Sequence, residues 1–208
     1  MELLLIRHAL PVRRELEDGI ADPQLSPEGL AQADRLADYL SSEKIHAVYA
    51  SPLQRAQQTA APLALNQGTT IVTVDDVAEW DRNSNEYVPV EELKAANDPR
   101  WQAMLRGEWN VHEESPDQFN KRCIDAIEAM IAEHSGQTIA IVCHGGVINA
   151  YLVHVLGLTV NVQGFFYPNY TSIHRVAAAR SGERSIVTIN ETSHLRNSGL
   201  PMGLFQKS

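Results

Sequence analysis

The chain has 208 residues, a length that predicts a single domain. Apolar residues make up 44% and charged residues 21%, which is typical of a globular protein and excludes a disordered one. The net charge is −9, from 17 basic and 26 acidic residues, and this argues against nucleic acid and membrane as partners because both attract basic faces.

Cysteine content and hydropathy indicate a cytoplasmic protein. The chain has two cysteines, Cys123 and Cys143, whereas a secreted domain would more often carry four or more. The apolar run at residues 3–6 is much shorter than the roughly 7–15 residues of a signal sequence. No apolar stretch approaches the roughly 20 residues that a membrane span needs.

The first third of the chain alternates predicted strands with predicted helices. Residues 3–6, 46–50 and 70–74 are short apolar or β-branched runs, as expected for strands buried in a sheet. Ser26 and Ser51 each precede a proline and a stretch with helical spacing of apolar residues. Both serines are therefore predicted to cap helices.

Residues 76–115 are less regular, and we interpret them as an insertion, or cap, lying over the sheet. They hold all three tryptophans, which would either line a substrate pocket or fill the insertion's own core. Ser115 and Gln118 then form a capping box at the start of a helix that Gly136 ends. The predicted elements that follow are a strand at 138–143, a tight turn at 144–146, a helix at 147–156 and a hairpin of 172–178 with 185–190.

This order predicts a three-layer α/β/α fold with a mostly parallel central sheet, formed by one domain over residues 1–208. In such sheets, ligands bind at the carboxyl ends of the strands, next to helix N-termini. Three strand ends carry unusual residues, namely Arg7-His8, Ser51 with Arg55 one turn later, and His144-Gly145-Gly146. Arginines and helix-start amides in one place suit a tetrahedral dianion such as a phosphate.

Four segments resemble motifs of the histidine phosphatase superfamily, which includes cofactor-dependent phosphoglycerate mutase. They occur in the family's order over residues 3 to about 157. The segments are Leu5-Ile6-Arg7-His8-Ala9, residues 25–33 (LSPEGLAQA), residues 51–60 (SPLQRAQQTA) and Val142-Cys143-His144-Gly145-Gly146. The resemblance implies a phosphoglycerate mutase-like fold and a phosphatase that works through a phosphohistidine.

The resemblance also implies roles for individual residues. His8 would be the nucleophile, and it would have to be neutral to attack phosphorus. Arg7, Arg55 and His144 would lower the pKa of His8 and, together with the backbone at Gly145, hold the phosphate and the charge of the transition state. These groups would fill the place that metal ions take in other phosphatases, so we expect neither a metal nor a cofactor.

A carboxylic acid must protonate the leaving oxygen and later activate water. The family places this acid just after the third strand, and residues 77–80 (VAEW) resemble that segment, which favours Glu79. Asp76 and Asp81 are the alternatives. Arg13 and Arg82 are candidates for binding the rest of an anionic substrate.

Two departures from the family pattern bear on activity. Alanine stands at position 9 where the signature has glycine, and a turn that required positive φ would then be strained. Residues 10–14 lack the acid, serine and asparagine with which the mutases continue, which favours a phosphatase over a mutase. The alternatives to a phosphatase are therefore a phosphoglycerate-type mutase and a catalytically weak phosphate-binding regulatory protein.

Other classes lack support in the sequence. The remaining histidines show no paired spacing typical of zinc ligands, and neither the dinucleotide-binding nor the P-loop glycine motif occurs. Cys143, which precedes His144, is predicted to be a small buried apolar residue rather than a nucleophile. The expected partner is a small phosphorylated substrate, and an unpaired edge strand would also support a homodimer.

Overall fold

The structure, a computed structural model, describes residues 1–106, 114–159 and 165–204. Its main sheet has six strands in the order β4-β3-β6-β1-β7-β8. The strands are β1 (Glu2–Arg7), β3 (Ala47–Ala50), β4 (Ile71–Thr73), β6 (Thr138–Cys143), β7 (Ile173–Ala178) and β8 (Arg184–Glu191). Strands β4, β3, β6 and β1 are mutually parallel, whereas β7 runs antiparallel to both of its neighbours, β1 and β8.

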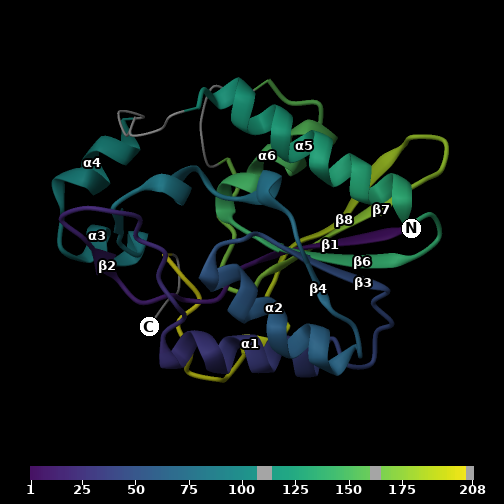
Figure 1. The fold of residues 1–208 in the computed structure, drawn as a ribbon, viewed down its shortest axis with the longest axis horizontal. Helices are drawn as coiled ribbons and strands as arrows, with labels where there is room; N and C mark the ends of the chain where they lie inside the picture. Colours follow the sequence, from purple (N-terminus) through teal and green to yellow (C-terminus); the bar gives the residue numbers. More distant parts are fainter. Residues whose placement is uncertain (107–113, 160–164, 205–208) are drawn as a thin grey trace.

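Helices cover both faces of this sheet (Figure 1). On one face lie α1 (Pro27–Tyr39) and α2 (Gln54–Asn66), and on the other lie α5 (Pro116–Glu133) and α6 (Gly145–Val155). Successive residues of β1 point to opposite faces, so Leu3 and Leu5 join the core under α5 and α6, whereas Leu4 and Ile6 join the core under α1 and α2. The predicted α/β/α fold with a mostly parallel sheet is confirmed.

The remaining elements are short. Strands β2 (Arg14–Glu15) and β5 (Glu86–Tyr87) form a separate two-stranded sheet, and α3 (Val90–Ala95) and α4 (Pro99–Leu105) follow β5. We call these four elements the cap. They lie beyond one end of the main sheet rather than over its face (Figure 1). The described residues also form three 3₁₀ helices, η1 (Asp75–Val77), η2 (Trp80–Asn83) and η3 (Ser193–Leu195).

Helix starts agree with the predictions in two cases and differ in two. Ser26 caps α1 by accepting the Gly29 N–H, and the capping box of α5 at Ser115 is present. Ser51, by contrast, is not an N-cap, because α2 begins at Gln54 and the Ser51 hydroxyl bonds a histidine instead. The predicted turn at residues 144–146 is wrong in part, since α6 already starts at Gly145.

The tryptophans are divided between core and cap. The Trp80 ring stacks on Phe119 of α5 with ring centroids 4.2 Å apart and packs against the core under α5 and α6. Trp101 lies partly buried in α4. Trp109 lies outside the described residues. No helix in the described ranges is long and apolar enough to cross a membrane.

Candidate active site

The three predicted strand ends meet at one edge of the sheet. The backbone of His8 extends the β1–β6 ladder, with its N–H donating to the Cys143 carbonyl at 2.9 Å. Ser51 extends the β3–β6 ladder in the same way, with its N–H 3.1 Å from the Val142 carbonyl. The ladders thus bring His8 beside His144, and their ring centroids are 5.1 Å apart.

The surroundings of His8 suit the nucleophile that the sequence predicts. It is almost fully buried, and its Nδ1 lies 2.7 Å from the Ala9 carbonyl. A carbonyl can only accept, so we assign the hydrogen to Nδ1, which leaves the Nε2 lone pair free to attack. Burial, together with the charges of Arg55 and Arg7, holds the pKa of His8 well below its usual value. The imidazole is therefore neutral at physiological pH.

Arg7 lies against an aromatic ring. Its guanidinium carbon is 4.2 Å from the centroid of the Tyr170 ring, and its Nη1 donates to the Pro168 carbonyl at 2.7 Å. Its Nε is buried and has no hydrogen-bond partner among the described residues. The contact with Tyr170 keeps the cation in place through its face and leaves donors in its plane.

Arg55, like Arg7, lies against the face of a tyrosine ring. It is 1% exposed in the first turn of α2, its guanidinium carbon is 4.7 Å from the centroid of the Tyr87 ring, and its Nη2 pairs with Asp81 at 2.6 Å. Its Nε, too, is buried with no partner in the described part of the chain. A buried cationic donor without a partner is costly, so two of them beside a buried histidine favour an anionic ligand.

His144 is oriented by Ser51. The Ser51 Oγ lies 2.7 Å from His144 Nε2 and accepts the Leu53 N–H at 3.3 Å, so its hydroxyl hydrogen can point to Nε2. This arrangement favours the hydrogen of a neutral His144 on Nδ1, a buried atom with no partner in the described residues. His144 also caps α6, so the free N–H groups of that helix start beside it at Gly145.

Glu79 is anchored at the start of α6. Its Oε2 accepts the Gly146 N–H at 2.8 Å, and its Oε1 accepts the Trp80 N–H at 3.1 Å. A Cβ on Gly146 would lie 2.3 Å from Oε1, so a larger residue there would displace the Glu79 carboxyl group. Burial and the nearby Asp81 charge raise the pKa of Glu79. A raised pKa suits a carboxyl group that must donate a proton near neutrality.

The two alternative acids lie in different environments. Asp76 is exposed, and Asp81 forms the ion pair with Arg55. The backbone before Glu79 is held by Arg122 of α5, whose Nη1 donates to the carbonyls of Asp76 and Ala78 at 2.8 Å each. Of the three candidates, Glu79 is the one whose carboxyl group is held at the start of α6, next to His144.

Comparison with known proteins identifies the family. The family model described as "Histidine phosphatase superfamily (branch 1)" matches residues 3–192. The chain belongs to this superfamily. It is 30% identical over 206 residues to "Phosphoserine phosphatase 1" of Hydrogenobacter thermophilus, with 94% of each chain covered. It is also 31% identical over 158 residues to "Phosphoglycerate mutase-like protein 4" of Arabidopsis thaliana, with 72% of this chain and 68% of the relative covered.

Solved structures agree on the fold. A phosphoserine phosphatase mutant from Entamoeba histolytica, crystallised with phosphoserine, superposes with a TM-score of 0.73 at 23% identity and covers 93% of this chain and 98% of its own. The predicted resemblance to the histidine phosphatases is confirmed, and so is the enzyme class of phosphomonoester hydrolase. A relative from Arabidopsis thaliana, 29% identical over 162 residues, is named a metal-independent phosphoserine phosphatase.

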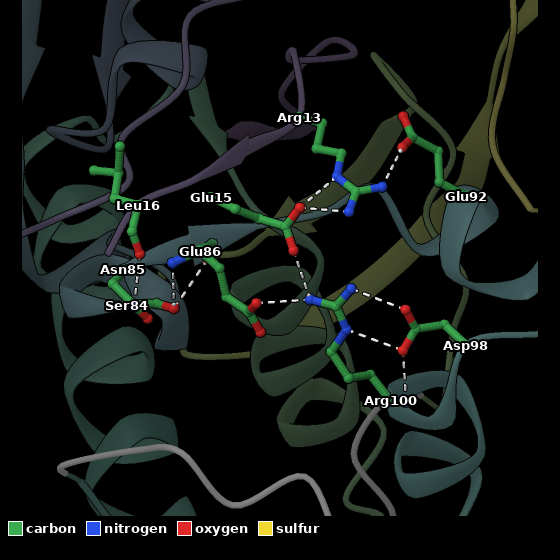
Figure 2. A network of polar contacts seen from close by, with 9 residues as sticks. All are labelled: Arg13, Glu15, Leu16, Ser84, Asn85, Glu86, Glu92, Asp98 and Arg100. Carbon is green, nitrogen blue, oxygen red and sulfur yellow. Dashed lines mark hydrogen bonds and ion pairs between the residues drawn. The ribbon is translucent and has the colours of Figure 1, made fainter. Parts of the chain in front are cut away.

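The two candidate substrate arginines of this histidine phosphatase lie in different settings. Arg13 joins the ion-pair cluster of the cap, where it bonds Glu15 and lies 3.6 Å from Glu92 (Figure 2). Arg82 lies in η2, three residues after Glu79, and is partly buried with no side-chain hydrogen bond or ion pair to a described residue. Arg82 is therefore the more available of the two cations.

Alanine at position 9 does not strain the signature. In the described ranges the non-glycine residues with positive φ are Asn97, Thr171, Asn190 and Asn197. Ala9 is absent from that set, so its turn does not require glycine. The residue is fully buried against Leu25 and Ala33, and its N–H donates to Thr59 Oγ1 at 2.9 Å.

Several site residues escape sequence reasoning. Tyr87 and Tyr170 contact Arg55 and Arg7, yet each tyrosine stands in a stretch without a motif. Arg122 is the seventh residue of α5, where the sequence alone suggests a cation exposed to solvent. The described residues contain no group of three or more His, Cys, Asp or Glu side chains placed to hold a metal ion.

Proposed function

We propose that the chain hydrolyses phosphate monoesters of small metabolites through a phosphohistidine at His8. The observation that carries the proposal is a buried neutral imidazole beside two buried guanidinium groups, those of Arg7 and Arg55, each with an unpartnered Nε. A dianionic phosphate would supply acceptors for both. The neutral Nε2 of His8 would then lie next to an electrophilic phosphorus.

In the first half-reaction, His8 Nε2 attacks phosphorus and the ester P–O bond breaks. The protonated carboxyl of Glu79 gives its proton to the leaving oxygen, and the alcohol departs. Arg7, Arg55 and the Nδ1 hydrogen of His144 stabilise the charge on the transferring phosphoryl group. The product is phospho-His8 with Glu79 now ionised.

In the second half-reaction, water attacks the phosphorus of phospho-His8. The Glu79 carboxylate takes the proton from this water, the N–P bond breaks, and inorganic phosphate leaves. His8 is again neutral and Glu79 again protonated, so the cycle closes with one ester and one water consumed.

The charge distribution supports a small substrate. The cations of the site are local, within a chain whose net charge is −9. Screening over about 8 Å at physiological salt lets a small phosphate ester approach, whereas a long polyanion would meet the acidic surface. Because two of the relatives are named phosphoserine phosphatases, phosphoserine is the first substrate to test.

A phosphate-release assay on a panel of esters tests the proposal. The panel contains phosphoserine, 3-phosphoglycerate, sugar phosphates and p-nitrophenyl phosphate, each with and without EDTA. We expect turnover of at least one ester that EDTA leaves unchanged, loss of turnover in His8→Ala, and radiolabel transfer from substrate to His8 in the parent protein. Lys121→Met, an exposed change on α5, is the control.

Three outcomes would contradict the proposal. Full activity of His8→Ala would exclude the phosphohistidine. Loss of activity with EDTA would show a metal requirement. Interconversion of phosphoglycerates faster than phosphate release in the same preparation would make the chain a mutase instead.

A further inference from the structure

The two catalytic arginines are covered by tyrosines of different origin. Tyr170, which covers Arg7, is fully buried just before β7, and its N–H donates to the Met202 carbonyl at 2.9 Å. Tyr87, which covers Arg55, belongs instead to β5 of the cap. Its ring centroid also lies 6.5 Å from that of His8, in an edge-on arrangement. One half of the site is thus completed by the cap.

The strand that carries Tyr87 is weak by itself. It is two residues long and pairs with β2, also two residues long. In this ladder Glu15 stands opposite Glu86, and like charges facing each other across a ladder destabilise it. Two bonds between Leu16 and Asn85, each 2.9 Å long, extend the pairing but leave the facing carboxylates uncompensated. An interaction with a cation would relieve their repulsion.

Arg100 at the start of α4 supplies that interaction (Figure 2). Its Nη1 donates to Glu15 at 3.0 Å and to Glu86 at 2.6 Å, and its Nη2 donates to Asp98 at 2.9 Å. It thereby places one cation between two facing carboxylates. The hydrogen bonds from Arg100 lower the pKa of Asp98 to about 2, and a lowered pKa is expected for a carboxylate held by a cation.

The geometry connects this cluster with the active site. Adjacent residues of a strand point in opposite directions, so Glu86 is held by Arg100 while Tyr87 faces the other way, over Arg55. The ring keeps water from one face of a guanidinium and restricts its rotation. Without the ring, the Arg55 guanidinium would be more exposed to water and could rotate more freely. It would then bind a phosphate more weakly.

We propose that Tyr87 is a positioning residue that sets the affinity for the phosphate ester, and that Arg100 acts through Tyr87 by holding the cap strand over Arg55. The proposal rests on the proposed phosphatase function. It assigns the cap a role in binding rather than in the chemical steps, because neither residue supplies a proton or a nucleophile.

Kinetics of four variants test it, namely Tyr87→Leu, Tyr87→Phe, Arg100→Met and the double variant of the first and third. Tyr87→Leu should raise KM about tenfold, which corresponds to about 1.4 kcal/mol, and leave kcat within about twofold. Tyr87→Phe keeps the ring and should retain the wild-type KM. Arg100→Met should raise KM as well, and the double variant should be no worse than the poorer single variant. Arg35→Met, an exposed arginine of α1, matches Arg100→Met in residue type and charge and should change nothing.

Other kinetic results would contradict the proposal. A fall in kcat at constant KM, or a Tyr87→Phe variant as poor as Tyr87→Leu, would overturn the role of the ring. Multiplying effects in the double variant would show that Arg100 does not act through Tyr87. Urea unfolding of each variant separates these effects from loss of fold. The Tyr87 pair decides the role of the ring even where Arg100→Met unfolds, and Arg100→Lys, which keeps the cation, then replaces Arg100→Met in the cycle.

Calorimetric binding of inorganic phosphate separates this proposal from the proposed function. If the parent binds phosphate but hydrolyses no ester, the proposed function fails, while weaker phosphate binding by Tyr87→Leu than by Tyr87→Phe still supports the inference. Equal binding by both variants overturns it. A parent that neither binds nor hydrolyses contradicts both proposals.

Discussion

The Ser51 hydroxyl lies 2.7 Å from His144 Nε2 and thereby joins two strand ends that are 93 residues apart in the chain. With its hydroxyl hydrogen directed to Nε2, it favours a neutral His144 that carries its hydrogen on Nδ1. The orientation of His144 therefore depends on a serine that the sequence pattern predicts as a helix cap.

Replacing Ser51 with alanine should lower kcat about tenfold, the effect of losing one hydrogen bond of about 1.4 kcal/mol. Without Ser51, the His144 hydrogen is free to move to Nε2, and Nδ1 then no longer donates to the phosphoryl group. Nitrogen-15 NMR of the histidine rings would report the tautomer directly. Ser41→Ala, an exposed serine bonded to the Asp38 carbonyl, is the control. An unchanged His144 tautomer in Ser51→Ala would rule this explanation out.

Replacing Glu79 with glutamine should lower kcat/KM for phosphoserine, which reports formation of the phosphohistidine, by about 10²–10⁴, the usual contribution of a general acid–base. The loss should be smaller for p-nitrophenyl phosphate, because its leaving group needs little protonation. Asp76→Asn, an exposed acid in the same segment, should leave both rates unchanged. Equal losses on the two substrates would show that Glu79 does not protonate the leaving group.

The pH dependence follows from the same two groups. In the proposed first half-reaction Glu79 is protonated, and its pKa is raised, so kcat/KM should fall as pH rises through that pKa, and Glu79→Gln should remove this limb. Because His8 must be neutral and its pKa is lowered, the acidic limb should lie well below the usual histidine range. A rate profile that falls with acid near the ordinary histidine pKa would contradict the second statement.

Local patterns explain which parts of this molecule the sequence could predict. Arg7, His8 and His144 stand directly after continuous apolar runs, so the strand-end rule alone brings them together. Ser51 shows the limit of the method, since a serine before proline has the same local signature whether it caps a helix or bonds a histidine 93 residues away. Only the β3–β6 ladder distinguishes the two.

The cap shows a second limit. Strands β2 and β5 have two residues each, too few for any periodicity to register. The strand that places Tyr87 over Arg55 is held by ion pairs between residues that are distant in the chain, such as Glu15 and Arg100. Charged residues in an irregular segment of a sequence suggest an exposed surface. The ion pairs between them can therefore be found only in the three-dimensional structure.

Replacing Ala9 with glycine should not raise activity, although glycine is the residue of the family signature. Ala9 has no positive φ, so its backbone releases no strain on substitution. Glycine would lose a buried methyl group and add unfolded-state entropy, which together should lower the free energy of unfolding by about 1–2 kcal/mol. Urea unfolding and one phosphatase assay check both parts. A large gain in activity would mean that Ala9 displaces His8 after all.

His174 should make the fold sensitive to acid. It is fully buried, and burial lowers its pKa to about 4. The unfolded chain binds a proton at this residue below pH of about 6.5 while the folded chain does not, so stability is complete above that pH and is lost as pH falls toward 4. Between pH 7 and pH 5, His174→Gln should therefore lose about 2 kcal/mol less unfolding free energy than the parent. Urea unfolding at the two pH values measures this, with the exposed His46→Gln as control. Equal losses in the parent and His174→Gln would show that His174 takes up its proton without unfolding.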